Sequence, residues 1–397
     1  MTGPLDGVRV VDLTAMLAGP YATMLLADLG ADVVKVEPPH GDGTRYVGPF
    51  RDEDGAEGLG GYFQSVNRGK RSIVLDLKTD ADRERLIALV RNADVLAENF
   101  SVGVMDRLGL GYERLAEENP RLVYAAIRGF GDPRTGESPY ADWPAFDVVA
   151  QAMGGLLSVT GTEDGTPIKA GPGIGDIFPA VLLALGIVSA VHHAHRTGQG
   201  QFVDVAMYDA VLALCERIVY QHSYTGAVPT PQGNSHPLLC PFDIFPTADG
   251  WVAVAAPHDR HWMIVADEIG RPDMGTDERY ARNIDRVRHG ADVRRALGGW
   301  LAERTTADVV ARLGGRVPIG PVNDVAAIFQ DPHVRARDML AEVKQPAGGT
   351  VVIAGQPIKF TETPAPVSER APTLGEHDPD AVRREWSSPS RTSPPQD

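Results

Sequence analysis

The feature that most constrains the fold is an alternation, over the first two hundred residues, of short β-branched runs with segments of helical pattern. The runs predict strands at residues 8–13, 32–38, 71–78, 94–100, 121–130 and 201–207. Helical patterns lie between them, at residues 21–29, 80–92, 106–118, 146–157 and 177–195. The alternation predicts βαβ units, and therefore an α/β fold whose mostly parallel sheet carries helices on both faces. Ligands of such sheets bind outside the carboxyl ends of the strands.

Proline and glycine mark a change of texture after a helical pattern at residues 208–220. A second, smaller unit follows, with a strand at 250–257 and helices around 259–269 and 292–314, while a late strand at 349–360 returns to the first unit. The predicted division is a large domain over 1–224, a linker over 225–243, a small domain over 244–330, a return segment over 331–386 that completes the large domain, and a mobile Ser/Pro-rich tail over 387–397.

Charge and cysteine content exclude several classes of protein. The 53 acidic and 38 basic side chains give a net charge of −15, which argues against a nucleic-acid or membrane-surface partner, so an anionic ligand needs a local basic pocket. The two cysteines form neither a disulfide framework nor a CxxC pair, and the N-terminus shows no signal-peptide pattern, so we expect a cytoplasmic protein. The apolar run at 177–191 is shorter than the roughly 18–20 residues of a membrane span and predicts a buried helix.

Motifs of common enzyme classes are absent from the sequence. No GxGxxG follows the first strand, and the chain has no phosphate loop, HExxH or GxSxG, which argues against a nicotinamide or flavin enzyme. Residues 41–191 contain no histidine, which excludes a histidine base in that stretch. The cluster HHAH at 192–195 lies at the C-terminal end of an apolar helix, where histidines interact favourably with the helix dipole. We therefore interpret the cluster as structural and predict no metal site.

A basic turn precedes the third predicted strand, in NRGKRSIVLDLK at 67–78. Arg68, Lys70 and Arg71 either form a solvated charge cluster or offer a phosphate site, since both cation types bind phosphate oxygens. The same field would gain from Lys35, Arg45 and Arg107 if the fold brings them together.

A single carboxylate, Asp176, stands in GPGIGDIFPA at 171–180 between a glycine-rich turn and the apolar run. It is interpreted either as the cap of a buried helix or as a nucleophile that the helix N-terminus keeps ionised. The glycines at 171, 173 and 175 allow close approach of a substrate, and their N–H groups are candidate donors to an oxyanion. Spacing alone leaves both interpretations open.

Ordered blocks along most of the chain resemble the class III CoA-transferases, the family of formyl-CoA and carnitine CoA-transferases and of the related α-methylacyl-CoA racemases. The blocks are AGPYATMLLADLGADVVKVEPPHGDGTR (18–45), NRGKRSIVLDLK (67–78), ADVLAENF (93–100), NPRLVYAAIRGFG (119–131), GIGD (173–176), TGQGQFVDVAMYDAVL (197–212) and PIGPVNDV (318–325). The resemblance implies a large Rossmann-like domain built from both ends of the chain, a small domain, and an interlocked homodimer.

The resemblance also implies the site residues. Asp176 falls on the family's catalytic aspartate, which attacks an acyl-CoA thioester and passes through anhydride and aspartyl-CoA intermediates to a small carboxylic acid acceptor; coenzyme A thioester is thus a substrate, and no cofactor is bound permanently. Gly173 and Gly175 would shape the pocket, with Asp147 in an acidic role. The residues implied for CoA are Leu75, Lys78, Asn99, Phe100 and Arg107, with Arg71 from the basic turn.

Departures from the family pattern bear on the substrate. Formyl-CoA transferase has a glutamine, an arginine and a Tyr-Glu pair where this chain has Leu17, Pro38, and Phe146 with Asp147, which argues against oxalate and formyl-CoA. A racemase needs a histidine some thirty residues before the aspartate, and 137–155 has none, so the transferase is favoured. A racemase and a catalytically inactive CoA-binding protein remain the alternatives, and no residue specifies the donor or the acceptor.

Overall fold

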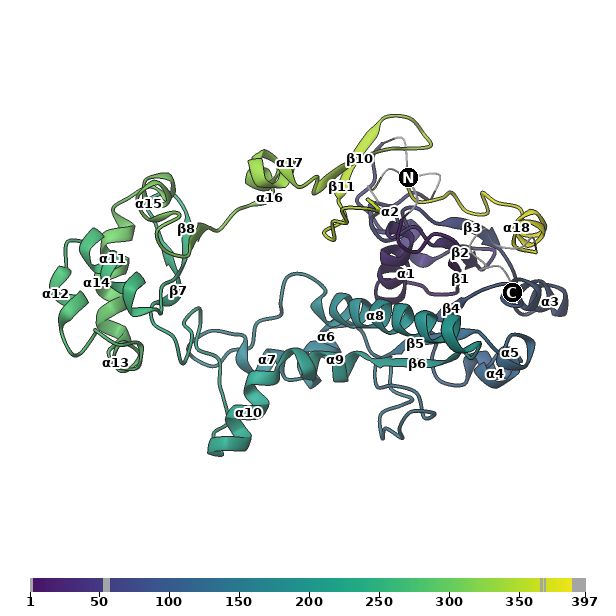
Figure 1. Cartoon of the computed structure of the whole chain (residues 1–397), viewed down its shortest axis with the longest axis horizontal. Helices are drawn as coiled ribbons and strands as arrows, with labels where there is room; N and C mark the ends of the chain where they lie inside the picture. The colour runs from purple at the N-terminus through teal and green to yellow at the C-terminus, as the bar shows by residue number, and fades with distance from the viewer. Residues whose placement is uncertain (1–2, 53–57, 365–366, 368, 388–397) are drawn as a thin grey trace. The chain divides into compact units, whose positions relative to one another are not determined.

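The computed structural model describes residues 3–52, 58–364, 367 and 369–387 (Figure 1). The chain groups into two units by its internal contacts: unit 1 contains residues 1–156, 170–226 and 332–397, and unit 2 contains residues 157–169 and 227–331. Apart from Ser387, the tail predicted to be mobile lies outside the described residues.

Unit 1 is built on a six-stranded, wholly parallel sheet. Its strands are β1 (Arg9–Asp12), β2 (Asp32–Glu37), β3 (Arg71–Val74), β4 (Val95–Glu98), β5 (Val123–Arg128) and β6 (Gln201–Ala206). They lie in the order β3-β2-β1-β4-β5-β6, so the predicted α/β fold and its six strands are confirmed. The order reverses between β1 and β4, and this topological switch point is where doubly wound sheets bind ligands.

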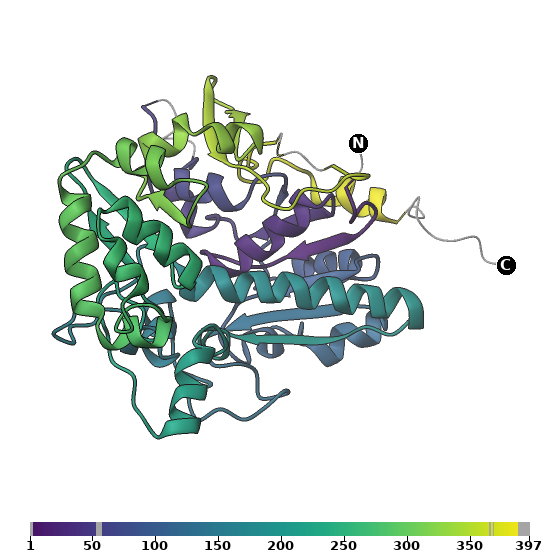
Figure 2. The same cartoon turned by 60° about the vertical axis from the view of Figure 1, so that its left-hand side comes forward.

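Helices cover both faces of this sheet, and alternate strand residues face opposite layers. Val10 packs in a cluster with α1 (Ala18–Asp28) and α8 (Ile174–Thr197), while Val11 packs in a second cluster with α3 (Asp80–Val90) and α5 (Tyr112–Glu118). Figure 2 shows α8 lying along β5 and β6. The other helical elements before α8 are η1 (Gly43–Tyr46), α2 (Gly61–Val66), α4 (Val104–Arg107), α6 (Asp147–Met153) and α7 (Leu156–Val159).

The helix α8 is longer than the apolar run that predicted it. It has 24 residues and is long and apolar enough to cross a membrane, by length and composition alone, so the prediction of a segment too short for a span is wrong for the whole helix. Leu183, Ile187 and Val191 are buried against the sheet. Core helices pass the same test, and α8 is such a partly buried core helix.

Two segments predicted as single helices are each broken in two. Residues 106–118 divide into α4 and α5 around Gly109, whose φ is +71°, and residues 146–157 divide into α6 and α7 around Gly155, whose φ is +94°. These glycines adopt the left-handed conformation, which an α-helix does not continue through. The pattern at 208–220 is likewise divided, into α9 (Met207–Leu214) and α10 (Glu216–Thr225).

The C-terminal part of the chain packs on unit 1. The predicted strand at 349–360 is the shorter β11 (Thr350–Ala354), which forms an antiparallel hairpin with β10 (Leu340–Lys344) after α17 (Pro332–Ala336) and does not join the large sheet. The last helix, α18 (Pro379–Trp386), completes the second core cluster through buried Val382 and Trp386. The Trp386 indole N–H donates to Asp32 Oδ2 over 2.7 Å, which fixes α18 beside β2.

Unit 2 has its own sheet and core. Its antiparallel strands β7 (Phe242–Pro246), β8 (Trp251–Ala255) and β9 (Ile319–Pro321) pack with helices around buried Trp262. The helices are α11 (Asp259–Glu268), α12 (Pro272–Thr276), α13 (Asn283–Arg288), α14 (Gly290–Ala302), α15 (Thr306–Leu313) and α16 (Val325–Gln330).

The unit boundaries differ from the predicted division in two places. Residues 157–169, assigned by sequence to the large domain, group with unit 2, where Glu163 pairs with Arg294. Most of the predicted linker also belongs to unit 2. The Asn283 side chain accepts from the Cys240 N–H and donates to the Leu238 carbonyl, so this proline-rich segment is held against α13.

Candidate active site

Most of the candidate residues lie at the carboxyl edge of the parallel sheet, whereas Arg71 begins β3 at the opposite edge. Residues 75–78 follow β3, residues 99–100 follow β4, and the loop at 13–17 follows β1. The helix α8 leads into the amino end of β6, and its length of about 36 Å carries its own N-terminus back to the carboxyl edge. Asp176 therefore lies at the carboxyl edge of the sheet, the edge at which the switch point between β1 and β4 predicts ligand binding.

Asp176 is the third residue of α8 and not its cap. The cap residue is Gly173, which makes no side-chain bond, and its carbonyl accepts from the N–H groups of Asp176 (3.1 Å) and Ile177 (2.8 Å). The interpretation of Asp176 as a helix cap is therefore wrong, because the helix begins three residues earlier than the sequence pattern indicates. The carboxylate is left for another role.

The cap of α8 comes from Asp147 on α6. Asp147 Oδ1 accepts from the Gly175 N–H over 2.7 Å, and the Gln151 amide Nε2 donates to both Asp147 oxygens over 2.8 and 2.9 Å. A β-carbon at Gly175 would stand 2.4 Å from the Asp147 carbonyl oxygen, so only glycine permits this approach. The prediction that the Gly175 N–H serves an oxyanion is wrong, since Asp147 occupies it. Sequence reasoning missed Gln151, although its i,i+4 spacing from Asp147 was a usable signal.

The pKa of Asp176 is raised, although we expected the helix N-terminus to keep this carboxylate ionised. Burial, followed by the charge of Asp147, raises the pKa of Asp176 to about 7. These two effects outweigh the helix dipole that we expected to keep the carboxylate ionised. Asp176 is accordingly a more basic carboxylate, and a stronger nucleophile when ionised, than an exposed aspartate.

Two further side chains border this carboxylate. A β-carbon at Gly173 would meet Leu17 Cδ2 at 3.0 Å, so the loop after β1 lies against the turn before α8. Tyr62 of α2 is half-buried, and burial together with the charges of Asp176, Asp42 and Asp147 raises its pKa, which keeps its phenol protonated. No sequence motif pointed to Tyr62.

The loops after β1 and β4 are tied to each other by Asn99. Its Oδ1 accepts from the Ala15 N–H over 2.9 Å, and its Nδ2 donates to the Ala15 carbonyl over 2.7 Å. Phe100 is held by Glu98, which accepts its N–H over 2.8 Å, and by Arg128, whose Nε donates to its carbonyl over 3.0 Å. The structure therefore fixes both sides of the switch point.

The other residues implied for CoA differ in accessibility. Lys78 and Arg107 are exposed, the latter at the end of α4 with its guanidinium against Gly103. Leu75 is 1% exposed and packs in the core, so its side chain does not line the surface as predicted. Arg71 pairs with Asp32 at 2.5 Å and with Glu385 at 2.7 Å.

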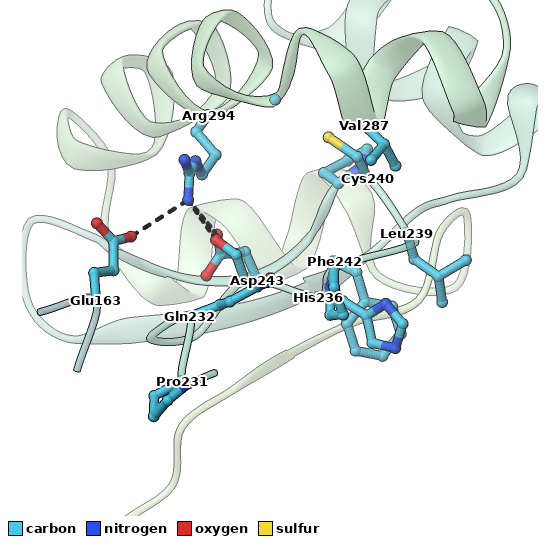
Figure 3. A pocket seen from close by; sticks show the side chains of 14 residues that line it. Glu163, Pro231, Gln232, His236, Leu239, Cys240, Phe242, Asp243, Val287 and Arg294 are labelled. Atoms are coloured by element: carbon cyan, nitrogen blue, oxygen red, sulfur yellow. Dashed lines mark hydrogen bonds and ion pairs between the residues drawn. The ribbon is translucent and has the colours of Figure 1, made fainter. Parts of the chain in front are cut away.

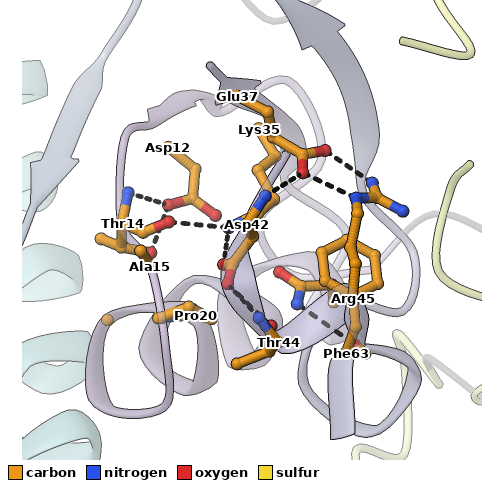
Figure 4. Close-up of polar contacts among 12 residues, drawn as sticks. Asp12, Thr14, Ala15, Pro20, Lys35, Glu37, Asp42, Thr44, Arg45 and Phe63 are labelled. Carbon is orange, nitrogen blue, oxygen red and sulfur yellow. Dashed lines mark hydrogen bonds and ion pairs between the residues drawn. The ribbon is translucent and has the colours of Figure 1, made fainter. Parts of the chain in front are cut away.

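The basic turn forms structural ion pairs. Buried Lys70 donates to Asp12 Oδ2 over 2.9 Å, and buried Arg68 pairs with Asp28 at 2.6 Å. Two of the three further predicted cations are also buried, since Lys35 pairs with Asp42 at 3.1 Å and Arg45 pairs with Glu37 at 2.6 Å (Figure 4). Both interpretations of this turn, a solvated charge cluster and a phosphate site, are therefore wrong for Arg68 and Lys70. The buried cations hold the loops instead, as when Lys35 donates to the Thr14 carbonyl over 2.7 Å.

Comparison with known proteins agrees with this geometry. The model of CoA-transferase family III matches residues 5–378. The chain belongs to CoA-transferase family III. It is 54% identical over 376 residues to the succinyl-CoA:mesaconate CoA-transferase of Haloarcula hispanica, covering 94% of each chain, and 42% identical to the acetyl-CoA:oxalate CoA-transferase of Acetobacter aceti, covering 98% and 97%. A CAIB/BAIF family protein of Brucella suis has the same fold, with a TM-score of 0.84, 37% identity, and 97% and 100% coverage.

This CoA-transferase is therefore a class III enzyme that moves CoA between an acyl-CoA and a carboxylic acid. The family and activity expected from the sequence blocks are confirmed. Among the described residues, no group of three His, Cys, Asp or Glu side chains is arranged to hold a metal ion.

Unit 2 of the transferase has a separate pocket of about 330 Å³ (Figure 3). Its cation, Arg294, donates to Ser235 over 2.5 Å and lies 3.5 Å from Glu163 and 3.9 Å from Asp243, so two carboxylates offset its charge. Burial raises the pKa of the Cys240 thiol in the same wall to about 11, so it is not a thiolate at neutral pH. This pocket offers neither a free anion site nor an activated nucleophile.

Proposed function

We propose that this enzyme transfers CoA from succinyl-CoA to a mesaconate-type dicarboxylate, with Asp176 as the covalent nucleophile. The observation that carries the catalytic role is the placement of Asp176 in the first turn of α8, half-buried and beside Asp147, with its pKa raised to about 7. The substrate pair is supported by the Haloarcula hispanica relative, which is 54% identical and named for succinyl-CoA and mesaconate.

The proposed reaction has four steps. A carboxylate oxygen of Asp176 attacks the thioester carbon of the donor, and the C–S bond breaks to give a mixed anhydride and the CoA thiolate. The thiolate attacks the Asp176 carbonyl carbon and releases the donor acid, leaving an aspartyl-CoA thioester. The acceptor carboxylate then displaces the thiolate to form a second anhydride, and the thiolate attacks the acceptor acyl carbon. The product acyl-CoA leaves and the Asp176 carboxylate is restored, with no net proton transfer.

The surroundings of Asp176 favour its acylated forms. Ionised Asp176 bears a charge that burial and Asp147 both destabilise, and acylation removes that charge. Part of the electrostatic energy stored in the free enzyme is therefore released when either anhydride or the thioester forms. The effect promotes attack on the donor without stabilising the free carboxylate.

For the CoA portion we propose Asn99 and Phe100 beside the switch point, and Lys78 and Arg107 for the phosphates. The two cations are exposed, in contrast to the buried pairs of the basic turn. Asn99 uses both ends of its amide on Ala15, which suits it to shape the loop that a pantetheine arm follows.

We propose a homodimer in the cytoplasm. In unit 1 a cavity of about 610 Å³ is lined by Gln64 and Gln345, which are 5% and 6% exposed and whose amide atoms lack hydrogen-bond partners within the described ranges. A second copy would supply those partners and cover α10, where Tyr224 is 88% exposed. Light scattering should give twice the chain mass, and a monomer would contradict the proposal.

The cytoplasmic setting is supported by Cys215 and Cys240, which are free and buried.

Chemical trapping tests the catalytic proposal. Incubation with succinyl-CoA and then borohydride, which reduces an activated aspartyl ester to an alcohol, should modify the peptide that contains Asp176. The Asp176→Ala variant is the control and should lose turnover while it keeps its affinity for CoA. An active enzyme whose Asp176 stays unmodified would contradict the proposed nucleophile.

A racemase would have a different signature. It would exchange the α-proton of a 2-methylacyl-CoA in heavy water with no acceptor acid present. The transferase should leave that proton in place, because no histidine occurs between residues 41 and 191 to act as a base. A catalytically inactive protein would bind CoA but form no product from any donor and acceptor pair.

A further inference from the structure

The side chain of Gln151 lies at the centre of the contacts that place the nucleophile. It is 0% exposed, on α6, and hydrogen-bonded to both Asp147 and residue 170. We propose that Gln151 is a positioning residue for CoA transfer, whose amide holds Asp147 and the turn before α8 so that Asp176 is presented to the thioester in one fixed arrangement. This inference rests on the proposed nucleophilic role of Asp176.

The partners of Gln151 determine the orientation of its amide. Its Oε1 accepts from the Ala170 N–H over 3.0 Å, and its Nε2 donates to Asp147 Oδ1 and Oδ2 over 2.8 and 2.9 Å. A main-chain N–H can only donate and an ionised carboxylate can only accept, so the reversed amide would lose every one of these bonds. Gln151 is thus a directional link between the two groups.

This link reaches Asp176 through two residues. Asp147 Oδ1 also accepts the Gly175 N–H over 2.7 Å, directly before the nucleophile in the chain. Gln151 and Asp147 together therefore tie both ends of the turn at 171–174, one at Ala170 and the other at Gly175. A change at Gln151 frees one end of the turn, and small displacements of a nucleophile carry large losses of rate.

Gln151 also bears on the charge beside the nucleophile. Burial, followed by the charge of Asp147, raises the pKa of the half-buried Asp176. The Gln151 amide and the Gly175 N–H both donate to Asp147, so this neighbouring carboxylate is held in one orientation. Without Gln151 the Asp147 carboxylate would lose two of these contacts, and its electrostatic effect on Asp176 would change.

Two substitutions separate positioning from general stability. Gln151→Leu removes both functions of the amide, and we expect kcat for succinyl-CoA to fall about thirtyfold or more while KM stays within about threefold. Gln151→Glu keeps an acceptor for the Ala170 N–H but turns a carboxylate toward Asp147. At low pH the introduced acid would be protonated and would donate to Asp147. Its kcat, relative to the wild type at the same pH, should therefore rise as the pH falls.

The matched control is Gln356→Leu. Gln356 is also buried and also accepts a main-chain N–H, from Ile358 over 3.2 Å, but it lies outside the proposed site. This variant should keep wild-type kcat. If Gln151→Leu fails to fold, Gln151→Glu decides alone: recovery at low pH supports positioning, and an equal loss at every pH overturns it.

Asp176→Ala, assayed in parallel, keeps the two proposals distinguishable. Wild-type kcat and pH profile in Gln151→Leu, with an inactive Asp176→Ala, would overturn the role of Gln151 and leave the proposed nucleophile standing. Full turnover in Asp176→Ala would overturn the nucleophile itself.

Discussion

Asp147 Oδ1 lies 2.7 Å from the main-chain nitrogen of Gly175, so the carboxylate that caps α8 belongs to a different helix. Gly175 directly precedes the proposed nucleophile, Asp176, in the chain. The contact has two effects. It fixes the start of α8, and it brings a second negative charge to Asp176, whose pKa rises to about 7. Structure and reactivity at this helix end therefore depend on the same carboxylate.

The charge of Asp147 should appear in the pH dependence of transfer. Asp176 must be ionised to attack, so kcat/KM of the wild type should rise with pH and level off above about 7. Asp147→Asn keeps an oxygen for the Gly175 N–H but removes the charge, so this rise should move to lower pH and the maximal kcat should fall. Initial rates measured from about pH 4 to about pH 9, a range that covers both the ordinary and the raised carboxyl pKa, would show this shift of the pH profile. An unmoved pH profile would mean that Asp147 does not act on Asp176 electrostatically.

The same raised pKa predicts a trade-off between stability and function. A carboxyl whose folded pKa lies above its unfolded value of 3.8 contributes full stability below that value, and the contribution is lost as pH rises through about 7. Asp176→Asn, neutral at every pH, should therefore exceed the wild type at pH 8 by about 1–3 kcal/mol in the free energy of unfolding and match it near pH 3.5, as measured by urea denaturation. A helix cap would behave oppositely, since its loss destabilises the protein.

Close packing of Gly175 on Asp147 should make this glycine irreplaceable. The β-carbon of Gly175→Ala would lie 2.4 Å from a main-chain oxygen, which cannot move as a flexible side chain does, so α6 and α8 must separate at a cost of about 1–3 kcal/mol. Gly136→Ala is the control, because Gly136 is exposed and its β-carbon would meet nothing within 4 Å. We expect Gly175→Ala to lower both Tm and kcat and Gly136→Ala to change neither, and a Gly175→Ala variant with wild-type values would contradict the close contact.

Which parts of this arrangement are predictable follows from the range of the interactions. The six strands and α8 are encoded locally, in β-branched runs and in one long apolar segment, and the ordered blocks place Asp176 within the family. The bond from Gly175 to Asp147 spans 28 positions, and the basic turn is neutralised by residues as distant as Glu385. No local pattern reports such partners. For that reason the sequence suggested that Asp176 caps its own helix and that the basic turn binds phosphate. In the structure Asp147 of α6 caps α8, and the cations of the turn form ion pairs.

The exposed cations at the carboxyl edge make the last prediction. Lys78 and Arg107 are the predicted basic residues there whose side chains remain exposed, whereas Lys70 and Arg45 are buried in ion pairs. If they bind the CoA phosphates, Lys78→Ala and Arg107→Ala should each raise KM for the acyl-CoA roughly tenfold, because a hydrogen bond to a charged group contributes about 1.5–3 kcal/mol. The kcat should stay unchanged, since neither group touches the reacting carbon.

Arg196→Ala provides the control for these two variants. Arg196 is equally exposed but lies in the last turn of α8, at the opposite edge of the sheet from Asp176. Added salt should lower the affinity for acyl-CoA in the wild type and in Arg196→Ala. The loss should be smaller in Lys78→Ala and Arg107→Ala, because each of these variants lacks a charge that the salt would screen. Equal KM values in all three variants would place the CoA phosphates elsewhere on the transferase.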